Sequence, residues 1–167
     1  MSAMAAVCLR TITVGVGDLV VSADPAIELV TYALGSCLGV IVHDPVVSVG
    51  GLLHVMLPSS TIAEGEADPR HERYVDTGVP MLFRSCYELG AQKSRMTVRV
   101  VGGSSSTAGD SFEIGKRNLL AVRKLLWKNG VLIEARETGG VGISRTVGLE
   151  IGTGRVWLRA GATCRVL

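Results

Sequence analysis

Glycine is the feature that most constrains the fold of this chain. The 167 residues include 21 glycines, which fall between short runs rich in valine, isoleucine and leucine. Short apolar runs bounded by turn residues are typical of β-strands joined by tight turns. We therefore expect strands at residues 11–16, 28–33, 38–43, 49–57, 96–101, 131–136, 145–151 and 155–159.

Two other segments have the period of an α-helix. Residues 76–89 and 116–129 repeat their apolar positions every three to four residues, and Gly90 and Gly130 follow where a left-handed cap is favoured. Pro80 lies early in the first segment, so that helix should begin late or bend there. The predicted fold class is α/β, a single-domain layered sandwich of mostly antiparallel strands with at least two helices packed on the sheet.

The composition is that of one folded domain. Apolar residues make up 47% of the chain and charged residues 19%, which supplies a core and argues against disorder. A chain of this length fits one domain, which we place at residues 1–167. The net charge of +2 is spread along the chain without a basic cluster. Nucleic acid is therefore not expected as a partner.

Targeting signals are not expected. The apolar opening is cut short by Arg10, without the charged region and cleavage site of a signal peptide. Every apolar run is shorter than the roughly 20 residues needed to cross a bilayer, so we expect no membrane insertion and a cytoplasmic location. Residues 59–73 are polar, and we interpret them as a mobile surface loop and a candidate lid.

The cysteines and histidines do not suggest a metal site. The four cysteines are far apart and form no C-x-x-C pair, and the three histidines lack metal-ligand spacing. Each cysteine is therefore considered by itself. Cys8, Cys86 and Cys164 have no partner in the sequence pattern, and we interpret them as structural or incidental thiols.

Cys37 and His54 are placed by a predicted hairpin. The turn sequence at Asp44 lies between two apolar runs and is typical of a type I turn. If Asp44 and Val47 close the hairpin, Cys37 lies directly across from His54, and both side chains share one face of the sheet. A slip of one residue would separate them.

Such a pair could perform nucleophilic catalysis. A free thiol has a pKa of about 8.5, and a neighbouring imidazole can take its proton and make it a nucleophile. Gly35 and Ser36 precede the cysteine and could turn the backbone so that amide groups face a developing oxyanion. Thr31 is the nearest upstream hydroxyl that could hold the second imidazole nitrogen. The alternative is a small buried thiol and a histidine satisfied by its surroundings.

A series of motifs resembles one family across nearly the whole chain. The motifs are Thr31-Tyr32-Ala33-Leu34-Gly35-Ser36-Cys37, His43-Asp44-Pro45, Gly50-Gly51-Leu52-Leu53-His54-Val55-Met56-Leu57-Pro58, Tyr74-Val75-Asp76-Thr77, Gly102-Gly103, Ile114-Gly115-Lys116-Arg117-Asn118, Thr138-Gly139-Gly140 and Thr153-Gly154-Arg155-Val156. In order and spacing they are similar to the chemoreceptor glutamine deamidase family, CheD.

The resemblance implies an enzyme. The threonine, cysteine and histidine triad of the family falls on Thr31, Cys37 and His54. The implied activity converts glutamines of methyl-accepting chemotaxis receptors to glutamates through a thioester on the cysteine, with no metal or cofactor. The same thioester chemistry would serve receptor glutamyl esters. Gly35, Ser36, Gly102 and Gly103 are the candidate substrate-binding or oxyanion residues.

The resemblance also bears on partners. Some family members bind the phosphatase CheC near the stretch after Gly102-Gly103, where the family commonly has an aromatic residue or methionine. This chain has Ser104-Ser105-Ser106-Thr107-Ala108 instead. The change argues against predicting CheC as a partner. The alternative function is a non-catalytic binding module that regulates a receptor or CheC, and for a helical receptor substrate we expect a shallow, open site.

Overall fold

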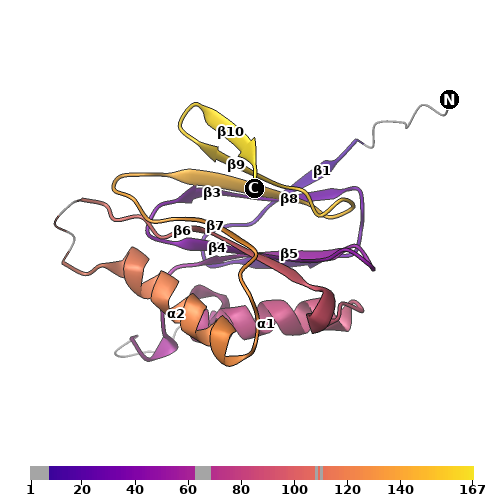
Figure 1. Ribbon diagram of the computed structural model, residues 1–167, viewed down its shortest axis with the longest axis horizontal. Helices are drawn as coiled ribbons and strands as arrows, with labels where there is room; N and C mark the ends of the chain where they lie inside the picture. The colour runs from indigo at the N-terminus through magenta and orange to yellow at the C-terminus, as the bar shows by residue number, and fades with distance from the viewer. Residues whose placement is uncertain (1–7, 63–68, 108, 110) are drawn as a thin grey trace.

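The computed structural model describes residues 8–62, 69–107, 109 and 111–167. They form three layers: a first sheet in the order β1-β3-β8-β9-β10, a second sheet in the order β2-β5-β4-β6-β7, and two helices on the outer face of the second sheet (Figure 1). The strands are β1 Arg10–Thr13, β2 Leu19–Ser22, β3 Ile27–Leu34, β4 Leu38–Asp44, β5 Val49–Val55, β6 Thr97–Gly102, β7 Ala135–Thr138, β8 Arg145–Glu150, β9 Val156–Ala160 and β10 Thr163–Val166. The helices are α1 Val75–Glu88 and α2 Ile114–Lys128.

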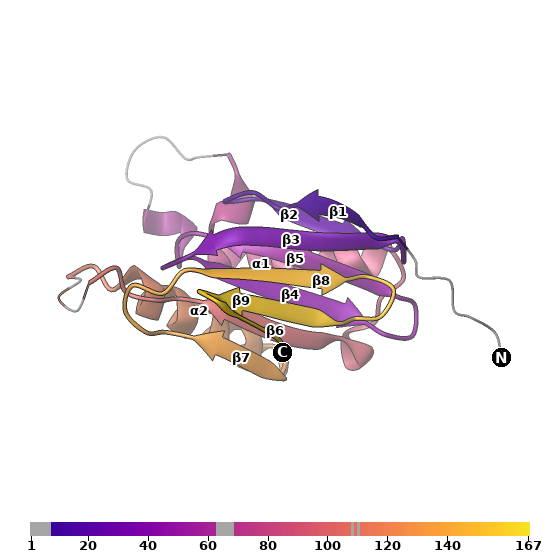
Figure 2. The same ribbon diagram turned by 90° about the horizontal axis from the view of Figure 1, so that it is seen from above.

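The predicted fold class is confirmed. Only β1 with β3 and β6 with β7 pair in parallel among the strands of the described residues, and the other pairs are antiparallel. Viewed from above, β3, β8 and β9 lie over β4 and β5 (Figure 2). The second sheet is therefore covered on both faces.

This double coverage explains the continuous apolar runs of the central strands. Every residue of β4 and β5 is buried, whereas a strand with one solvated face would alternate. Ile41 and Leu52 belong to the core between the two sheets. Val40 and Leu53, their neighbours in sequence, belong to the core between the second sheet and the helices. Successive side chains thus enter two different cores.

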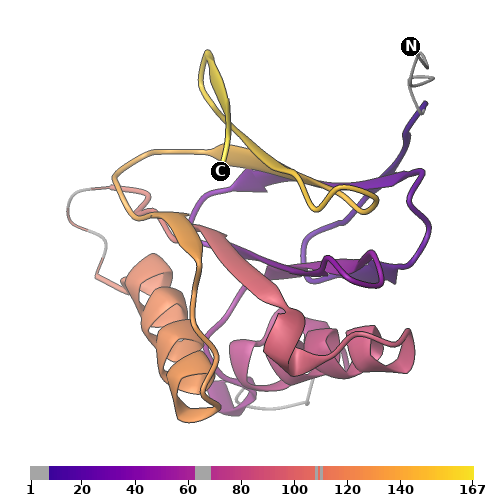
Figure 3. The same ribbon diagram turned by 45° about the vertical axis from the view of Figure 1, so that its right-hand side comes forward.

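The helices end where the glycines predicted. Gly90 and Gly130 follow α1 and α2 with φ of 96° and 66°, in the left-handed range that favours glycine. Pro80 lies inside α1, which already begins at Val75, so of the two expected outcomes the late start is excluded. Figure 3 shows α1 and α2 next to each other beneath the second sheet.

Three strand predictions needed correction. β2 and β10, two four-residue strands at sheet edges, were not predicted. β7 begins at Ala135 instead of residue 131, because Val131 and Ile133 pack as a connecting segment against the core beneath the second sheet. The candidate lid falls partly on residues 63–68, which lie outside the described residues. Its flanks, Ser60–Ile62 and His71–Arg73, form single 3₁₀ turns.

The β4–β5 hairpin has a different register from the predicted one. Asp44 pairs with Val49, so the loop has four residues rather than two, and His54 lies opposite Gly39 instead of Cys37. The longer loop is stabilised by the Asp44 carboxylate, which accepts a hydrogen bond from the amide of Val46 at 3.0 Å. The shift is two residues, which preserves the face on which each side chain lies.

None of the described helices is long and apolar enough to span a membrane.

Candidate active site

Thr31 and His54 meet between the two sheets. Thr31 belongs to β3 of the first sheet and His54 to β5 of the second, and both are fully buried. The Thr31 hydroxyl oxygen lies 2.7 Å from Nδ1 of His54. Gly39, opposite His54, has no side chain, and a methyl group there would lie only 3.0 Å from Leu34 and 3.4 Å from Val147. The imidazole therefore has no side chain beside it on β4.

A second hydrogen bond fixes the tautomer of His54. The Thr31 hydroxyl donates its single proton to the carbonyl oxygen of Val14 at 2.7 Å, so it can only accept from the imidazole. Nδ1 therefore carries the proton, and Nε2 of the neutral ring is an unprotonated base. Nε2 is buried and has no hydrogen-bond partner among the described residues.

Cys37 immediately precedes β4 and lies diagonally from His54. Its position has the same parity as Gly39 and Ile41, and its side chain is half-buried against the core between the sheets. Cys37 and His54 therefore occupy one face of the second sheet, at the end where β4 begins. Within the described part of the chain, Nε2 is not hydrogen-bonded to the Cys37 sulfur. Such catalytic contacts often tighten only when substrate is bound.

Burial keeps both groups neutral at rest. It raises the pKa of the Cys37 thiol above its usual value, against the opposing effect of the cysteine's own backbone N–H. It also lowers the pKa of His54, against the charge of Asp18, which raises it. Both shifts favour a thiol and a neutral imidazole as the resting state. For a neutral pair of this kind, attack by the sulfur would require proton transfer to the imidazole, as in general-base catalysis.

Two glycines hold the backbone of Cys37. The amide of Gly103 donates to the carbonyl oxygen of Cys37 at 2.9 Å. Gly102 has φ of 113°, and a methyl group on it would overlap the same carbonyl oxygen. Glycine is required at Gly102 both by its φ and by this close approach. The two residues thus support Cys37 from β6.

The turn before Cys37 is made by Ala33 rather than by Gly35. Ala33 has φ of 56°, and β3 has a register shift between Thr31 and Leu34, where the chain leaves the first sheet for the second. A left-handed alanine is strained, and such strain gathers at functional sites. Gly35 has no positive φ, and a methyl group there would meet no atom within 4 Å. The reason expected for a glycine at this position was therefore wrong.

Gly35 and Ser36 line an open hollow beside Cys37. Its volume is about 430 Å³. The other lining residues come from the segment after β6, the start of α2 and the segment before β8; they are Ser104, Ser105, Ser106, Phe112, Ile114, Gly142, Ile143 and Ser144. Ser104 is tied in place by its hydroxyl, which donates to the carbonyl of Ile143 at 2.7 Å. The hollow is open to solvent.

Comparison with known proteins identifies the family. Residues 56–160, well over half of the chain, match the family model described as CheD chemotactic sensory transduction. The chain belongs to the CheD family. A CheD relative from Syntrophus aciditrophicus, named probable chemoreceptor glutamine deamidase CheD 1, is 47% identical over 89% of this chain and 93% of its own. A relative from Solibacter usitatus, named probable chemoreceptor glutamine deamidase CheD, is 45% identical over 90% of this chain and 89% of its own.

The CheD matches extend over the candidate site. A relative from Pyrococcus abyssi, also named probable chemoreceptor glutamine deamidase CheD, is 39% identical over 90% of this chain and 91% of its own. The family model begins at Met56, after Thr31, Cys37 and His54. The pairwise matches are so long that each must include the segment that carries these three residues.

Sequence reasoning missed two contributors to this CheD site. The Val14 carbonyl, which fixes the direction of the Thr31 hydroxyl, is a backbone group and leaves no trace in residue type. The side chain of Asn118, near the start of α2, is fully buried and bonded to Ser36 and Met56. The motif Ile114-Gly115-Lys116-Arg117-Asn118 was the one sequence signal that could have indicated this role.

His43, which precedes the Asp44 turn, is not a surface residue. It is buried, and Nε2 donates to the carbonyl of Ile151 at 2.8 Å, which joins β4 to the end of β8. Gly154 packs against its ring, because a methyl group there would lie 2.5 Å from Nδ1. His43 is therefore a structural link at the end of β4 away from Cys37.

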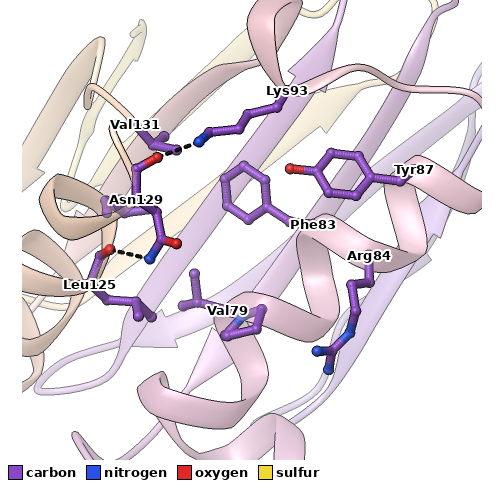
Figure 4. Close-up of a pocket in the computed structure, with 10 residues that line it drawn as sticks. Val79, Phe83, Arg84, Tyr87, Lys93, Leu125, Asn129 and Val131 are labelled. Atoms are coloured by element: carbon purple, nitrogen blue, oxygen red, sulfur yellow. Dashed lines mark hydrogen bonds between the residues drawn. The ribbon is translucent and has the colours of Figure 1, made fainter.

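A second hollow, of about 200 Å³, lies between α1 and α2 (Figure 4). Its lining is mainly apolar, and Figure 4 shows Phe83 and Tyr87 of α1 facing Leu125 of α2 and Asn129, which follows the helix. The first hollow is lined by Gly35 and Ser36, next to Cys37, whereas this one has no lining residue adjacent in sequence to Cys37 or His54. We therefore assign it no part in hydrolysis. Across the described residues, no three His, Cys, Asp or Glu side chains gather as metal ligands would.

Proposed function

We propose that this CheD-family chain is a protein-glutamine deamidase that acts on methyl-accepting chemotaxis receptors in the cytoplasm, as a single domain over residues 1–167. The observation that carries the proposal is the fixed tautomer of His54. Thr31 accepts from Nδ1, and the bare Nε2 lies on the same face of the second sheet as Cys37. The names of the relatives supply the substrate class.

The first half of the reaction forms a thioester. Nε2 of His54 takes the thiol proton while the Cys37 sulfur attacks the amide carbon of the substrate glutamine. The carbonyl oxygen becomes an oxyanion, for which the backbone amide of Cys37 is the candidate donor. Collapse breaks the carbon–nitrogen bond, and the imidazolium protonates the leaving nitrogen, which departs as ammonia.

The second half uses water. The neutral imidazole accepts a proton from a water molecule that attacks the thioester carbon. The carbon–sulfur bond breaks, the sulfur regains its proton from His54, and the product is glutamate. The sum is one glutamine side chain and one water converted to one glutamate side chain and one ammonia. The residues named need no cofactor for this cycle.

The neutral resting pair fits an amide substrate in an open site. A permanent thiolate would react with many electrophiles, whereas this thiol needs both the base and a bound carbonyl. Gly35 and Ser36 would contact the chain that carries the glutamine, because they line the hollow beside Cys37. CheC is not included in the proposal, since no feature of the described site supports its binding.

The test is mass spectrometry of a chemoreceptor cytoplasmic fragment incubated with the protein in water enriched in oxygen-18. The wild type should convert specific glutamines to labelled glutamates. Cys37→Ala should convert none, and Cys164→Ala, which removes an exposed thiol away from the site, should act as the wild type. Fragment binding without conversion by any of the three proteins would favour the non-catalytic binding module instead.

A further inference from the structure

Asn118 is a buried polar side chain whose orientation is fully determined. It lies in the second turn of α2 and is fully buried. Its Nδ2 donates to the carbonyl of Ser36 at 3.0 Å and to that of Met56 at 2.9 Å. Both partners are acceptors only, so the NH₂ group must face them and the amide cannot be flipped.

This one amide group joins the two segments that carry the candidate catalytic side chains. Ser36 immediately precedes Cys37, and Met56 follows His54 by two residues. The two carbonyls lie 82 and 62 positions from Asn118 in the sequence. Among the hydrogen bonds of the described residues, these two connect α2 to both segments at once. The side chain therefore links Cys37 and His54 through a rigid helix.

The hydrogen bond to Ser36 also sets the direction of the Cys37 amide. The peptide between them is trans and planar, as are all peptides of the described chain, so its C=O and N–H point in opposite directions. With the C=O held toward α2, the N–H points away from the helix. The same N–H lowers the pKa of the Cys37 thiol, against the larger effect of burial. A carbonyl attacked by that sulfur would place its oxygen beside the same N–H.

The carbonyl oxygen of the Asn118 side chain, Oδ1, indicates that this residue serves to hold the Ser36 and Met56 carbonyls. Oδ1 is buried without a hydrogen-bond partner among the described residues. A buried acceptor left unpaired is unfavourable, and such exceptions are expected at functional sites. An apolar residue of similar size would avoid this cost, but it would leave the Ser36 and Met56 carbonyls without a donor.

We propose that Asn118 is a positioning residue that holds the Ser36–Cys37 peptide so that the Cys37 N–H faces the developing oxyanion. The inference rests on the proposed function. It does not depend on which receptor glutamines are chosen, because the geometry lies within this chain. Asn129 offers a matched control: it lies at the end of the same helix, and its Nδ2 donates to Leu125 at 2.8 Å, away from the site (Figure 4).

The experiment compares Asn118→Ala and Asn118→Asp with Asn129→Ala. All three are made in a background with Cys8→Ser and Cys164→Ser, which removes the two exposed thiols; Cys86 is buried and its pKa is raised to about 12. The first readout is the rate of Cys37 alkylation by iodoacetamide against pH. The second is kcat and KM for deamidation of the receptor fragment.

Both Asn118 variants should shift the alkylation profile to higher pH and lower kcat by about 10²-fold, the usual effect of losing one oxyanion donor, with KM nearly unchanged. Asn129→Ala should match the background protein in both. A folded Asn118→Ala with background alkylation and kcat would overturn the proposal. If the alanine variant does not fold, Asn118→Asp, which keeps the size of the side chain, takes its place. A folded Asn118→Asp with background alkylation and kcat would then overturn the proposal.

Two further results remain decisive. If both Asn118 variants fail to fold while Asn129→Ala folds, the residue is structural and the proposal is wrong. If the background protein deamidates no fragment, the proposed function fails separately. The alkylation profiles then decide on Asn118, since iodoacetamide reports on Cys37 without any receptor.

Discussion

At the scale of single residues, the decisive feature is a hydroxyl with one proton. Thr31 donates that proton to Val14 and must accept from His54. In many catalytic triads a carboxylate or amide orients the imidazole. Here an uncharged hydroxyl between two sheets does so, which adds no buried charge that would raise the pKa of His54.

Replacing Thr31 tests this role. Thr31→Val keeps the shape but removes the acceptor for Nδ1, so the tautomer is no longer fixed and kcat should fall. The decrease in kcat should not exceed the contribution of general acid–base catalysis, which is usually about 10²- to 10⁴-fold. Thr31→Ser keeps the hydroxyl and should retain most of the activity. Steady-state kinetics on the receptor fragment make the comparison, and equal kcat for the valine and serine variants would contradict the assigned role.

The pH dependence of the rate follows from the direction of the His54 shift. His54 must be neutral to act as base, and burial lowers its pKa below the ordinary 6.5. The acid limb of kcat/KM should therefore lie below pH 6.5. The same shift makes stability fall as pH drops below 6.5, because the unfolded histidine binds a proton there and the folded one does not. An acid limb above pH 6.5 would argue against His54 as the base.

At the scale of elements, Asp44 ties the β4–β5 hairpin to the segment between α1 and β6. Its buried carboxylate accepts from the amide of Gln92 at 2.9 Å and pairs with Arg95, whose NH2 group lies 2.7 Å away. Burial opposes ionisation, but the hydrogen bonds from Arg95, Gln92 and Val46 outweigh it and lower the pKa from 3.8 to about 2. The hairpin that carries His54 is thereby anchored at the end away from Cys37.

This anchor should appear as acid sensitivity. The contribution of Asp44 is present above pH 3.8 and is lost as pH falls toward 2, and its size is about 2 kcal/mol. Asp44→Asn should remove that part of the pH dependence and lower the free energy of unfolding near neutral pH. Urea unfolding at pH 3 and pH 7 measures both. Asp76→Asn, at an exposed carboxylate bonded to Ser59 and Ser60, is the control.

The elements were largely predictable, and the contacts between them were not. Apolar runs located β3, β4 and β5, and their parity put Cys37 and His54 on one face. The register was wrong by two residues, because residue type did not reveal that Asp44 stabilises a four-residue loop. The role of Asn118 could not be predicted, since its partners are backbone carbonyls distant in sequence and a polar residue near a helix start usually faces solvent.

At the scale of the whole molecule, the candidate site spans the interface of the two sheets. Thr31 belongs to the first sheet, and His54 and Cys37 belong to the second. Their spacing depends on the core between the sheets, which includes Leu149. The core beneath the helices, which includes Leu82, has no such link to the Thr31–His54 hydrogen bond.

Two leucine truncations separate these cores. Leu149→Ala and Leu82→Ala each remove a fully buried side chain and should each cost about 2–5 kcal/mol of stability. At a temperature where both variants remain folded, Leu149→Ala should have the lower kcat, because the sheets can shift relative to one another. Thermal unfolding followed by circular dichroism sets that temperature. Equal kcat for the two variants would contradict the dependence on sheet spacing.

The division of the site between two sheets also bears on how the protein is made. A ribosome releases Thr31, Cys37 and His54 early, but β8, the strand that pairs with β3, is among the last to emerge. Until it does, the first sheet is incomplete and Thr31 has no fixed place over His54. A nascent or damaged chain would thus carry a thiol but no working base. The protein would thus become active only when the fold is complete, and a partly synthesised chain would not deamidate other glutamines in the cell.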